Sequence, residues 1–169
     1  PTVKGLRALI ICRRLKWIMR WSNLPVKWWV VLYSVRLSSP GDEIVKNLTA
    51  LCANVLQPLR DQLRLSLSVS SGYRCERVNL AIGGVTKSQH QFGQAADINV
   101  PGKSVEWLYQ KIKKSGLPFD QLIQEFNSWV HVSFNAKGNR KQTLRATRLN
   151  RKTVYTHDKW SGNFNLQNY

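Results

Sequence analysis

Three potential metal ligands, carried by separate segments of the chain, most strongly constrain how it can fold. His90 and Asp97 lie seven residues apart, and the connector Gln-Phe-Gly-Gln-Ala-Ala lets the backbone turn closely around an ion. His131 follows much later, inside the apolar stretch from Trp129 to Phe134. Two imidazoles and one carboxylate leave one coordination position open for water, as a catalytic zinc ion requires. The fold must therefore bring these three side chains together.

The spacing of apolar residues predicts one long helix before the ligands and a shorter one after them. From Ile44 to Leu63, apolar residues recur at intervals of three and four, which is typical of one buried helix face. Pro58 lies inside this pattern and predicts a kink or a break near residues 56–57, because proline lacks the backbone N–H. The second helix is expected to be capped by Ser104 and to end at Gly116.

Alternating apolar and polar residues predict the strands that carry the ligands. Leu65, Leu67 and Val69 alternate with serines, and residues 95–100 form a second expected strand. Residues 119–125 and 129–134 are expected to form a hairpin. If Glu125 faces Trp129 in that hairpin, Ile123 faces His131. Glu125 and His131 then share one face as diagonal neighbours, roughly 7 Å apart.

Together these elements predict an α+β fold with a small, mainly antiparallel sheet flanked by helices, and with the zinc site on the sheet. Residues 79–88, which contain two adjacent glycines, are expected to form a long turn near that site. The chain becomes basic after Asn135, and a short last strand is expected over residues 153–155. The expected domain spans residues 41–156, and residues 157–169 form a C-terminal tail.

Residues 1–40 differ in character from the rest of the chain. They carry eight Lys or Arg residues, no acid, and four of the seven tryptophans. A basic, tryptophan-rich segment can touch a membrane surface, but on a helical wheel Arg13 and Arg20 fall on the apolar side, so such contact is expected to be weak. No stretch here approaches the ~20 apolar residues that span a bilayer, and no signal peptide is expected. We therefore treat this segment as an N-terminal extension.

The charge of the chain predicts an anionic partner. It has 26 Lys and Arg against 9 Asp and Glu, a net charge of +17, and a length of 169 residues that suits one domain. An anionic cell wall fits this charge. Nucleic acid remains an alternative on charge alone, although no nucleic-acid-binding motif is present. The cysteines Cys12, Cys52 and Cys75 lack zinc-finger spacing, so they are free thiols, or one disulfide and a spare thiol.

A catalytic zinc site also needs a base and a cation. The ion lowers the pKa of a bound water, a base must take the water proton, and a cation must hold the developing oxyanion. Glu125 is the candidate base, with Asp120 as its alternative. Arg74 is the candidate cation, although it can also serve only as an ion-pair partner of Asp97 or Glu76.

Residues beside these groups are expected to contact the substrate. Ser88 and Gln89 immediately precede the first ligand and can hydrogen-bond a substrate carboxylate or amide. Tyr73 precedes the candidate cation in the segment Ser-Gly-Tyr-Arg. His157 lies in a polar segment without metal-type spacing, and we leave it out of the site.

Four motifs resemble the zinc D-alanyl-D-alanine carboxypeptidases and the related L-alanyl-D-glutamate endolysins, which share a hedgehog-like zinc peptidase fold. The motifs are Ser71-Gly72-Tyr73-Arg74, Ser88-x-His90-x-x-Gly93-x-Ala95-x-Asp97, Phe119-Asp120-Gln121-Leu122-Ile123 and Trp129-Val130-His131-Val132-Ser133. The resemblance covers about residues 42–155. It implies that His90, Asp97 and His131 are zinc ligands and that Arg74 stabilises the transition state.

The resemblance also implies a carboxylate base near the last histidine. Many members of the family place it three residues before that histidine, where this chain has Ser128. Glu125, six residues before His131, matches the subgroup that has a Trp-Val-His strand. Both Glu125 and Asp120 therefore remain candidates for the base.

The resulting hypothesis is a zinc-dependent peptidase, with one zinc ion, that cleaves peptidoglycan stem peptides as a D-Ala-D-Ala carboxypeptidase or as an endolysin. Such a protein is expected to be a monomer that acts at the bacterial cell wall, in the periplasm, outside the cell or as a phage product. The alternative is a zinc-containing module that binds the cell wall without hydrolysing it.

Overall fold

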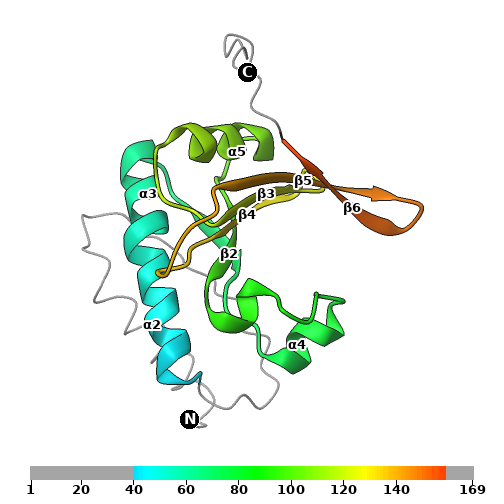
Figure 1. Cartoon of the computed structure of the whole chain (residues 1–169). Helices are drawn as coiled ribbons and strands as arrows, with labels where there is room; N and C mark the ends of the chain where they lie inside the picture. The colour runs from blue at the N-terminus through cyan, green and yellow to red at the C-terminus, as the bar shows by residue number, and fades with distance from the viewer. Residues whose placement is uncertain (1–39, 159–169) are drawn as a thin grey trace, which may run out of the picture.

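A continuous helix opens the part of the chain that the structure, a computed structural model, describes, namely residues 40–158 (Figure 1). It consists of α2 (Asp42–Leu51), the π-helical turn η1 (Cys52–Leu56) and α3 (Gln57–Leu63). The helix therefore continues through Pro58 and does not break there. In η1 the N–H of Gln57 donates to the carbonyl of Cys52. This wider turn lets the chain bypass the hydrogen bond that a proline cannot donate.

The second predicted helix is α5 (Val105–Lys114), and its cap is confirmed. The Ser104 hydroxyl accepts a hydrogen bond from the N–H of Trp107 at 3.1 Å, and Gly116 follows the helix with a φ of 75°. Two shorter elements were not predicted, α4 (Glu76–Ala81) and the 3-10 helix η2 (Gln89–Phe92). The long turn expected over residues 79–88 therefore begins inside α4. Elements of four to six residues are too short for an apolar period to reveal them.

All six strands form one sheet in the order β1-β2-β4-β3-β5-β6. Their bounds are Ser68–Ser71 (β1), Ala95–Asn99 (β2), Gln121–Glu125 (β3), Trp129–Ser133 (β4), Gln142–Leu149 (β5) and Lys152–His157 (β6). The predicted hairpin register is confirmed, because Glu125 pairs with Trp129 and Ile123 pairs with His131. The hairpin turns through Phe126 and Asn127, both with a φ of 53°.

The sheet is mixed, so the prediction of a mainly antiparallel sheet was wrong on this point. After β4 the chain returns to lie beside β3, and β5 runs parallel to it. Sequence alone missed β5, because only Leu144 and Ala146 are buried in a basic, polar segment. At the other edge β1 begins later than predicted, and Leu65 is exposed.

Contacts continue past the domain boundary expected at residue 156. His157 is the last residue of β6 and pairs with Leu144. Asp158 then accepts a hydrogen bond from the Lys113 ammonium group of α5 at 3.0 Å. The predictions for residues 1–39 and 159–169 concern residues that lie outside the described part of the chain. Within the described part, Cys52 and Cys75 are both free thiols.

The two faces of the sheet have different roles. One face packs against the α2–α3 helix and α5 in the main core, which includes Leu59, Ile98, Tyr109, Leu122 and Val132. The opposite face carries Asp97 and His131, together with a smaller apolar cluster of Ile123, Leu144 and Ala146 against which Phe126 packs. The main core thus supports the sheet from behind and leaves this second face, the site face, for chemistry.

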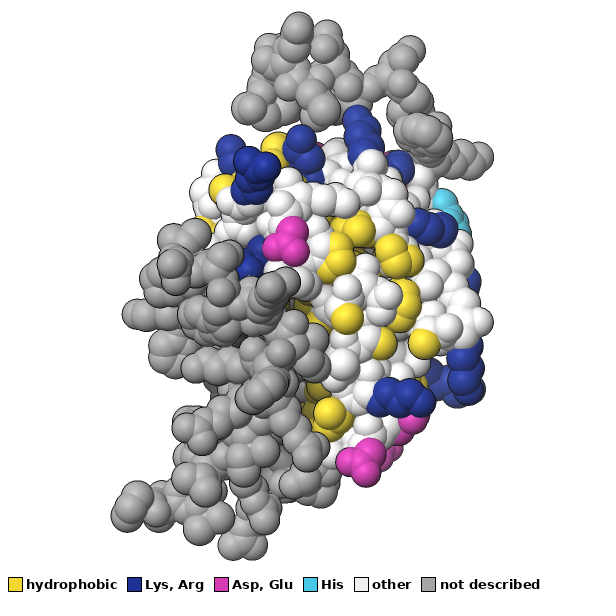
Figure 2. Space-filling model, turned by 90° about the vertical axis from the view of Figure 1, so that its left-hand side faces the viewer, with side chains coloured by type: hydrophobic (Ala, Val, Ile, Leu, Met, Phe, Trp, Pro, Cys, Tyr) yellow, Lys and Arg dark blue, Asp and Glu magenta, His cyan; other side chains and the backbone are white. Residues whose placement is uncertain are grey.

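The surface shows the excess of basic residues expected from composition. In the view of Figure 2, Lys and Arg side chains lie around the edge of the described surface, and hydrophobic side chains form a band across it. Among the described helices, none is both long and apolar enough to cross a membrane.

Candidate metal centre

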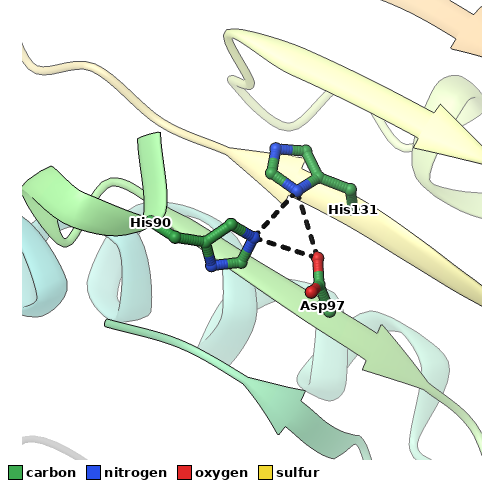
Figure 3. Close-up of side chains that lie close together, drawn as sticks. All are labelled: His90, Asp97 and His131. Carbon is green, nitrogen blue, oxygen red and sulfur yellow. Dashed lines mark hydrogen bonds and ion pairs between the residues drawn. The ribbon is translucent and has the colours of Figure 1, made fainter. Parts of the chain in front are cut away.

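The three predicted metal ligands meet on the site face of the sheet (Figure 3). Asp97 of β2 and His131 of β4 are direct cross-strand partners, so their side chains stand side by side. His90 reaches them from η2, which precedes β2. The residues Asp97, His131 and His90 are 3%, 7% and 2% exposed, respectively. These polar groups are therefore largely removed from bulk water.

The ligand atoms form a nearly equilateral triangle. His90 Nε2, His131 Nδ1 and Asp97 Oδ1 lie 3.1 Å from one another in all three pairs. A tetrahedral zinc ion with bonds of about 2.0–2.1 Å requires ligand atoms separated by about 3.3 Å. The triangle therefore matches one face of a zinc coordination tetrahedron and leaves the fourth position outside it.

A hydrogen bond to the backbone fixes which nitrogen of His90 faces the centre. His90 Nδ1 lies 2.7 Å from the carbonyl oxygen of Gly72, and a carbonyl can only accept. Nδ1 must therefore carry the proton, so the neutral ring turns the lone pair of Nε2 toward Asp97 and His131. A carbonyl that orients a ligating histidine in this way is a common feature of zinc sites. The donor set fits a zinc ion.

Arg74 contacts the other oxygen of the Asp97 carboxylate. Its Nη2 donates to Asp97 Oδ2, and its Nε donates to the Ser71 hydroxyl at 2.7 Å. Burial raises the pKa of Asp97, but the neighbouring His131 and His90 rings together lower it by more, so the net pKa lies below its ordinary value. Asp97 is therefore ionised, with one oxygen facing the centre and one held by the guanidinium group. Arg74 thus forms an ion pair with Asp97, which was the simpler of its two predicted roles.

Close packing explains the small residues between His90 and Asp97. Gly93 ends η2 with a φ of 68°, and a Cβ there would lie 2.7 Å from the carbonyl oxygen of Ile44 in α2. A side chain at this position would push η2 away from α2. The Asn47 side chain of α2 also donates to the Phe92 carbonyl at 2.9 Å. The main helix therefore fixes the segment that carries the first ligand.

Glu125 lies beside the centre, at the end of β3. It is half-buried and shares the site face with His131, two residues along from the His131 partner Ile123. Burial raises the pKa of Glu125, and the Asp97 carboxylate raises it further, whereas His131 and Arg74 lower it; the net pKa is above its ordinary value. A carboxylate with a raised pKa is a stronger base, which suits proton transfer near neutral pH.

Asp120, the alternative base, is engaged in other contacts. Its carboxylate accepts three hydrogen bonds from Arg140, at 3.0 Å from the backbone N–H and at 2.9 and 2.6 Å from the guanidinium group. It also accepts one from Gln89 at 2.7 Å. The hydrogen bonds from Arg140 hold its pKa below the ordinary range. These contacts favour Glu125 over Asp120 as the base, and Arg140 is a neighbour of Asp120 that the sequence pattern did not reveal.

Replacing Asp120 with asparagine is expected to destabilise the fold by about 1–3 kcal/mol at pH 7, because the new amide turns N–H donors toward donors of Arg140 or Gln89. The lowered pKa makes the ionised carboxylate stabilising above the unfolded-state pKa. The difference from wild type should therefore shrink as the pH falls through the folded-state pKa of Asp120. Urea unfolding at several pH values measures it. The same change at the exposed Asp61 should alter stability by less than about 0.5 kcal/mol.

The predicted substrate-contacting residues lie around the His90 segment. Ser88 immediately precedes η2, and Tyr73 lies in the half-buried segment between β1 and α4. Gln89 uses its amide N–H₂ on Asp120, and its Oε1 is buried without a hydrogen-bond partner among the described residues. Gly72, whose carbonyl orients His90, was expected only as part of a motif.

Comparison with known proteins adds an independent finding. Residues 35–133 of the chain match the family described as Peptidase M15. The matched segment includes the three residues of the ligand triangle, as well as Glu125 and Arg74. It ends at the last residue of β4. No curated protein matches the chain.

Proposed function

Since this chain belongs to the peptidase M15 family, whose members are zinc-dependent peptidases, we propose that it hydrolyses peptide bonds of peptidoglycan stem peptides, as a D-Ala-D-Ala carboxypeptidase or an endolysin. His90, Asp97 and His131 would hold a single zinc ion. The observation that carries the proposal is the triangle of ligand atoms 3.1 Å apart, on the same face of the sheet as Glu125.

Bound at this triangle, zinc would polarise the scissile carbonyl and make water more acidic. Glu125 then takes one proton from the attacking water as its oxygen bonds to the carbonyl carbon. It delivers that proton to the nitrogen of the scissile bond, which leaves as an amine when the C–N bond breaks. The carboxylate thus ends in its starting state, and one water is consumed for each peptide bond cleaved.

Arg74 is suited to hold the oxyanion that develops on the carbonyl. Its Nε and Nη2 are occupied by Ser71 and Asp97, which fix the guanidinium plane. Nη1 has no hydrogen-bond partner within residues 40–158, so its N–H groups remain for the substrate oxygen. A preorganised donor of this kind stabilises the transition state more than the ground state.

The decisive experiment is mass spectrometry of muropeptides incubated with the zinc-loaded protein, with the chelator-treated protein, and with the chelated protein after zinc is restored. We expect new peptide termini in the first and third samples only. The position of the new termini distinguishes removal of a terminal D-alanine from cleavage within the stem. Identical products after zinc removal would refute the zinc mechanism.

The alternative is a zinc-containing module that binds the cell wall without cleaving it. Stoichiometric zinc and binding to cell-wall sacculi, with no amine released, would support that function. In either case the net charge of +17 favours retention on an anionic wall, and we propose that the protein acts there as a monomer. Salt-dependent binding to sacculi that persists after zinc removal would show that charge alone is responsible.

A further inference from the structure

The site face continues past Glu125 into strands that the family match does not cover. Glu125 pairs with Ala146 of β5, and Ala146 pairs with Tyr155 of β6. Cross-strand partners project from the same face, so all three share the face of the metal centre. Ala146 is fully buried and small, whereas Tyr155 is 50% exposed. The pKa of Tyr155 is raised by burial and by the Glu125 carboxylate, which agrees with the phenol lying across Ala146 toward Glu125.

Aromatic and apolar side chains form a floor between the metal centre and β5. Phe126 packs against the cluster of Ile123, Leu144 and Ala146, and its ring meets that of Trp129 edge to face at 5.9 Å between centroids. Phe126 adopts a φ of 53°, a conformation that is uncommon for a bulky residue. The tertiary structure therefore holds this ring on the site face at some cost in backbone energy.

A single arginine stands at the far end of this floor. Arg148 pairs with Thr153, two residues along each strand from the pair of Ala146 and Tyr155, so it projects from the same face. Its guanidinium group lies 5.1 Å from the centre of the Phe126 ring. A ring beneath the guanidinium orients it and leaves its edge N–H groups free. Within residues 40–158, Arg148 has no acidic partner, and residues 147–157 contain no Asp or Glu.

We propose that Arg148, held over Phe126, is a subsite for a carboxylate of an extended substrate whose scissile bond lies at the metal centre. Ile123, the cross-strand partner of His131, also pairs with Leu144 of β5, and Leu144 lies four residues before Arg148. Strand geometry then separates the backbones of His131 and Arg148 by about 16 Å. Allowing for the arginine side chain, this spans roughly three to five residues of extended peptide. The inference rests on the proposed peptidase function and specifies its substrate as an acidic peptide.

The test compares two synthetic peptides that differ by one charge. They are L-Ala-γ-D-Glu-L-Lys-D-Ala-D-Ala and its analogue in which the α-carboxylate of the glutamate is a carboxamide. Calorimetry with zinc-loaded Glu125→Gln protein gives Kd without turnover. The measurement is repeated with two double variants, in which Glu125→Gln is combined with Arg148→Gln or with Lys152→Gln. Lys152 is the matched control, because it lies in the same hairpin but pairs with Leu149 and projects from the opposite face.

We expect the acidic peptide to bind about three- to tenfold more tightly than its carboxamide when Arg148 is present, as for a charge-assisted hydrogen bond at an exposed site. Arg148→Gln should remove this preference, and Lys152→Gln should keep it. Equal affinity for the two peptides, equal losses in both variants, or binding of neither peptide would overturn the subsite.

Hydrolysis by the wild-type protein is measured in parallel with the same two peptides. Cleavage without a preference for the acidic peptide would remove the subsite and leave the peptidase function intact. Charge-selective binding that depends on Arg148, without cleavage, would keep the subsite and remove the peptidase function.

Discussion

Replacing Glu125 with glutamine is expected to lower kcat for peptide hydrolysis by about 10²- to 10⁴-fold, the usual contribution of general acid–base catalysis. Glutamine keeps the size of the side chain but cannot accept and return the water proton. The three ligand atoms belong to other residues, so zinc content should stay at one ion per protein. Steady-state kinetics and metal analysis of the same preparation measure both quantities.

The same substitution is expected to stabilise the metal-free protein near neutral pH. Burial raises the folded-state pKa of Glu125 above its unfolded value, so folding disfavours the ionised carboxylate. This cost is absent below the unfolded-state pKa and is fully present above the folded-state pKa. The Tm of Glu125→Gln should therefore exceed that of wild type at pH 7, and the difference should shrink at lower pH.

Glu43→Gln is the matched control for this substitution, because Glu43 is exposed at the start of α2 and lies outside the sheet that carries the site face. It should leave both kcat and the pH dependence of Tm close to wild type. A Glu125→Gln protein that retains wild-type kcat would assign the base to another group. A loss of zinc in that variant would instead indicate that Glu125 acts on the metal centre.

Replacing His131 with alanine is expected to abolish stoichiometric zinc binding and to reduce hydrolysis to that of the chelator-treated protein. Changes to residues that merely orient a ligand weaken metal affinity 10- to 100-fold, so loss of a ligand itself should exceed about 100-fold. Zinc stabilises a native state that alone binds it by about 2.7 kcal/mol at 100 times Kd. Added zinc should therefore raise the Tm of wild type but not that of His131→Ala.

His157 offers a matched control within the same sheet. It lies in the same cross-strand row as His131, through Ile123 and Leu144, but three strands away and exposed. His157→Ala should retain zinc, activity and the zinc-dependent rise in Tm. If His131→Ala still binds one zinc ion per protein, the ion is held elsewhere and the triangle is not the metal centre.

Local patterns in the sequence were sufficient for the main helix, for α5 and for the hairpin of β3 and β4. The apolar period from Ile44 to Leu63 predicted the main helix, and Ser104 predicted the cap of α5. The period of two also set the register of β3 and β4, because a shift by one residue would turn His131 and Glu125 into the core. The ligand set followed from donor chemistry and from the resemblance in four motifs.

Tertiary structure decided what depends on residues distant in the chain. β5 pairs in parallel with β3 although its own segment is basic and only partly apolar, since its partner rather than its composition makes it a strand. Asp120 is engaged by Arg140, which the segment between β4 and β5 brings to it, and by Gln89, so these contacts favour Glu125 as the base. The sequence alone thus determined the donors and the strands that carry Asp97, His131 and Glu125, but not the short helix η2 that carries His90. The long-range pairing of β5 and β6 decided how far the site face extends, because strand partners are not encoded in local periodicity.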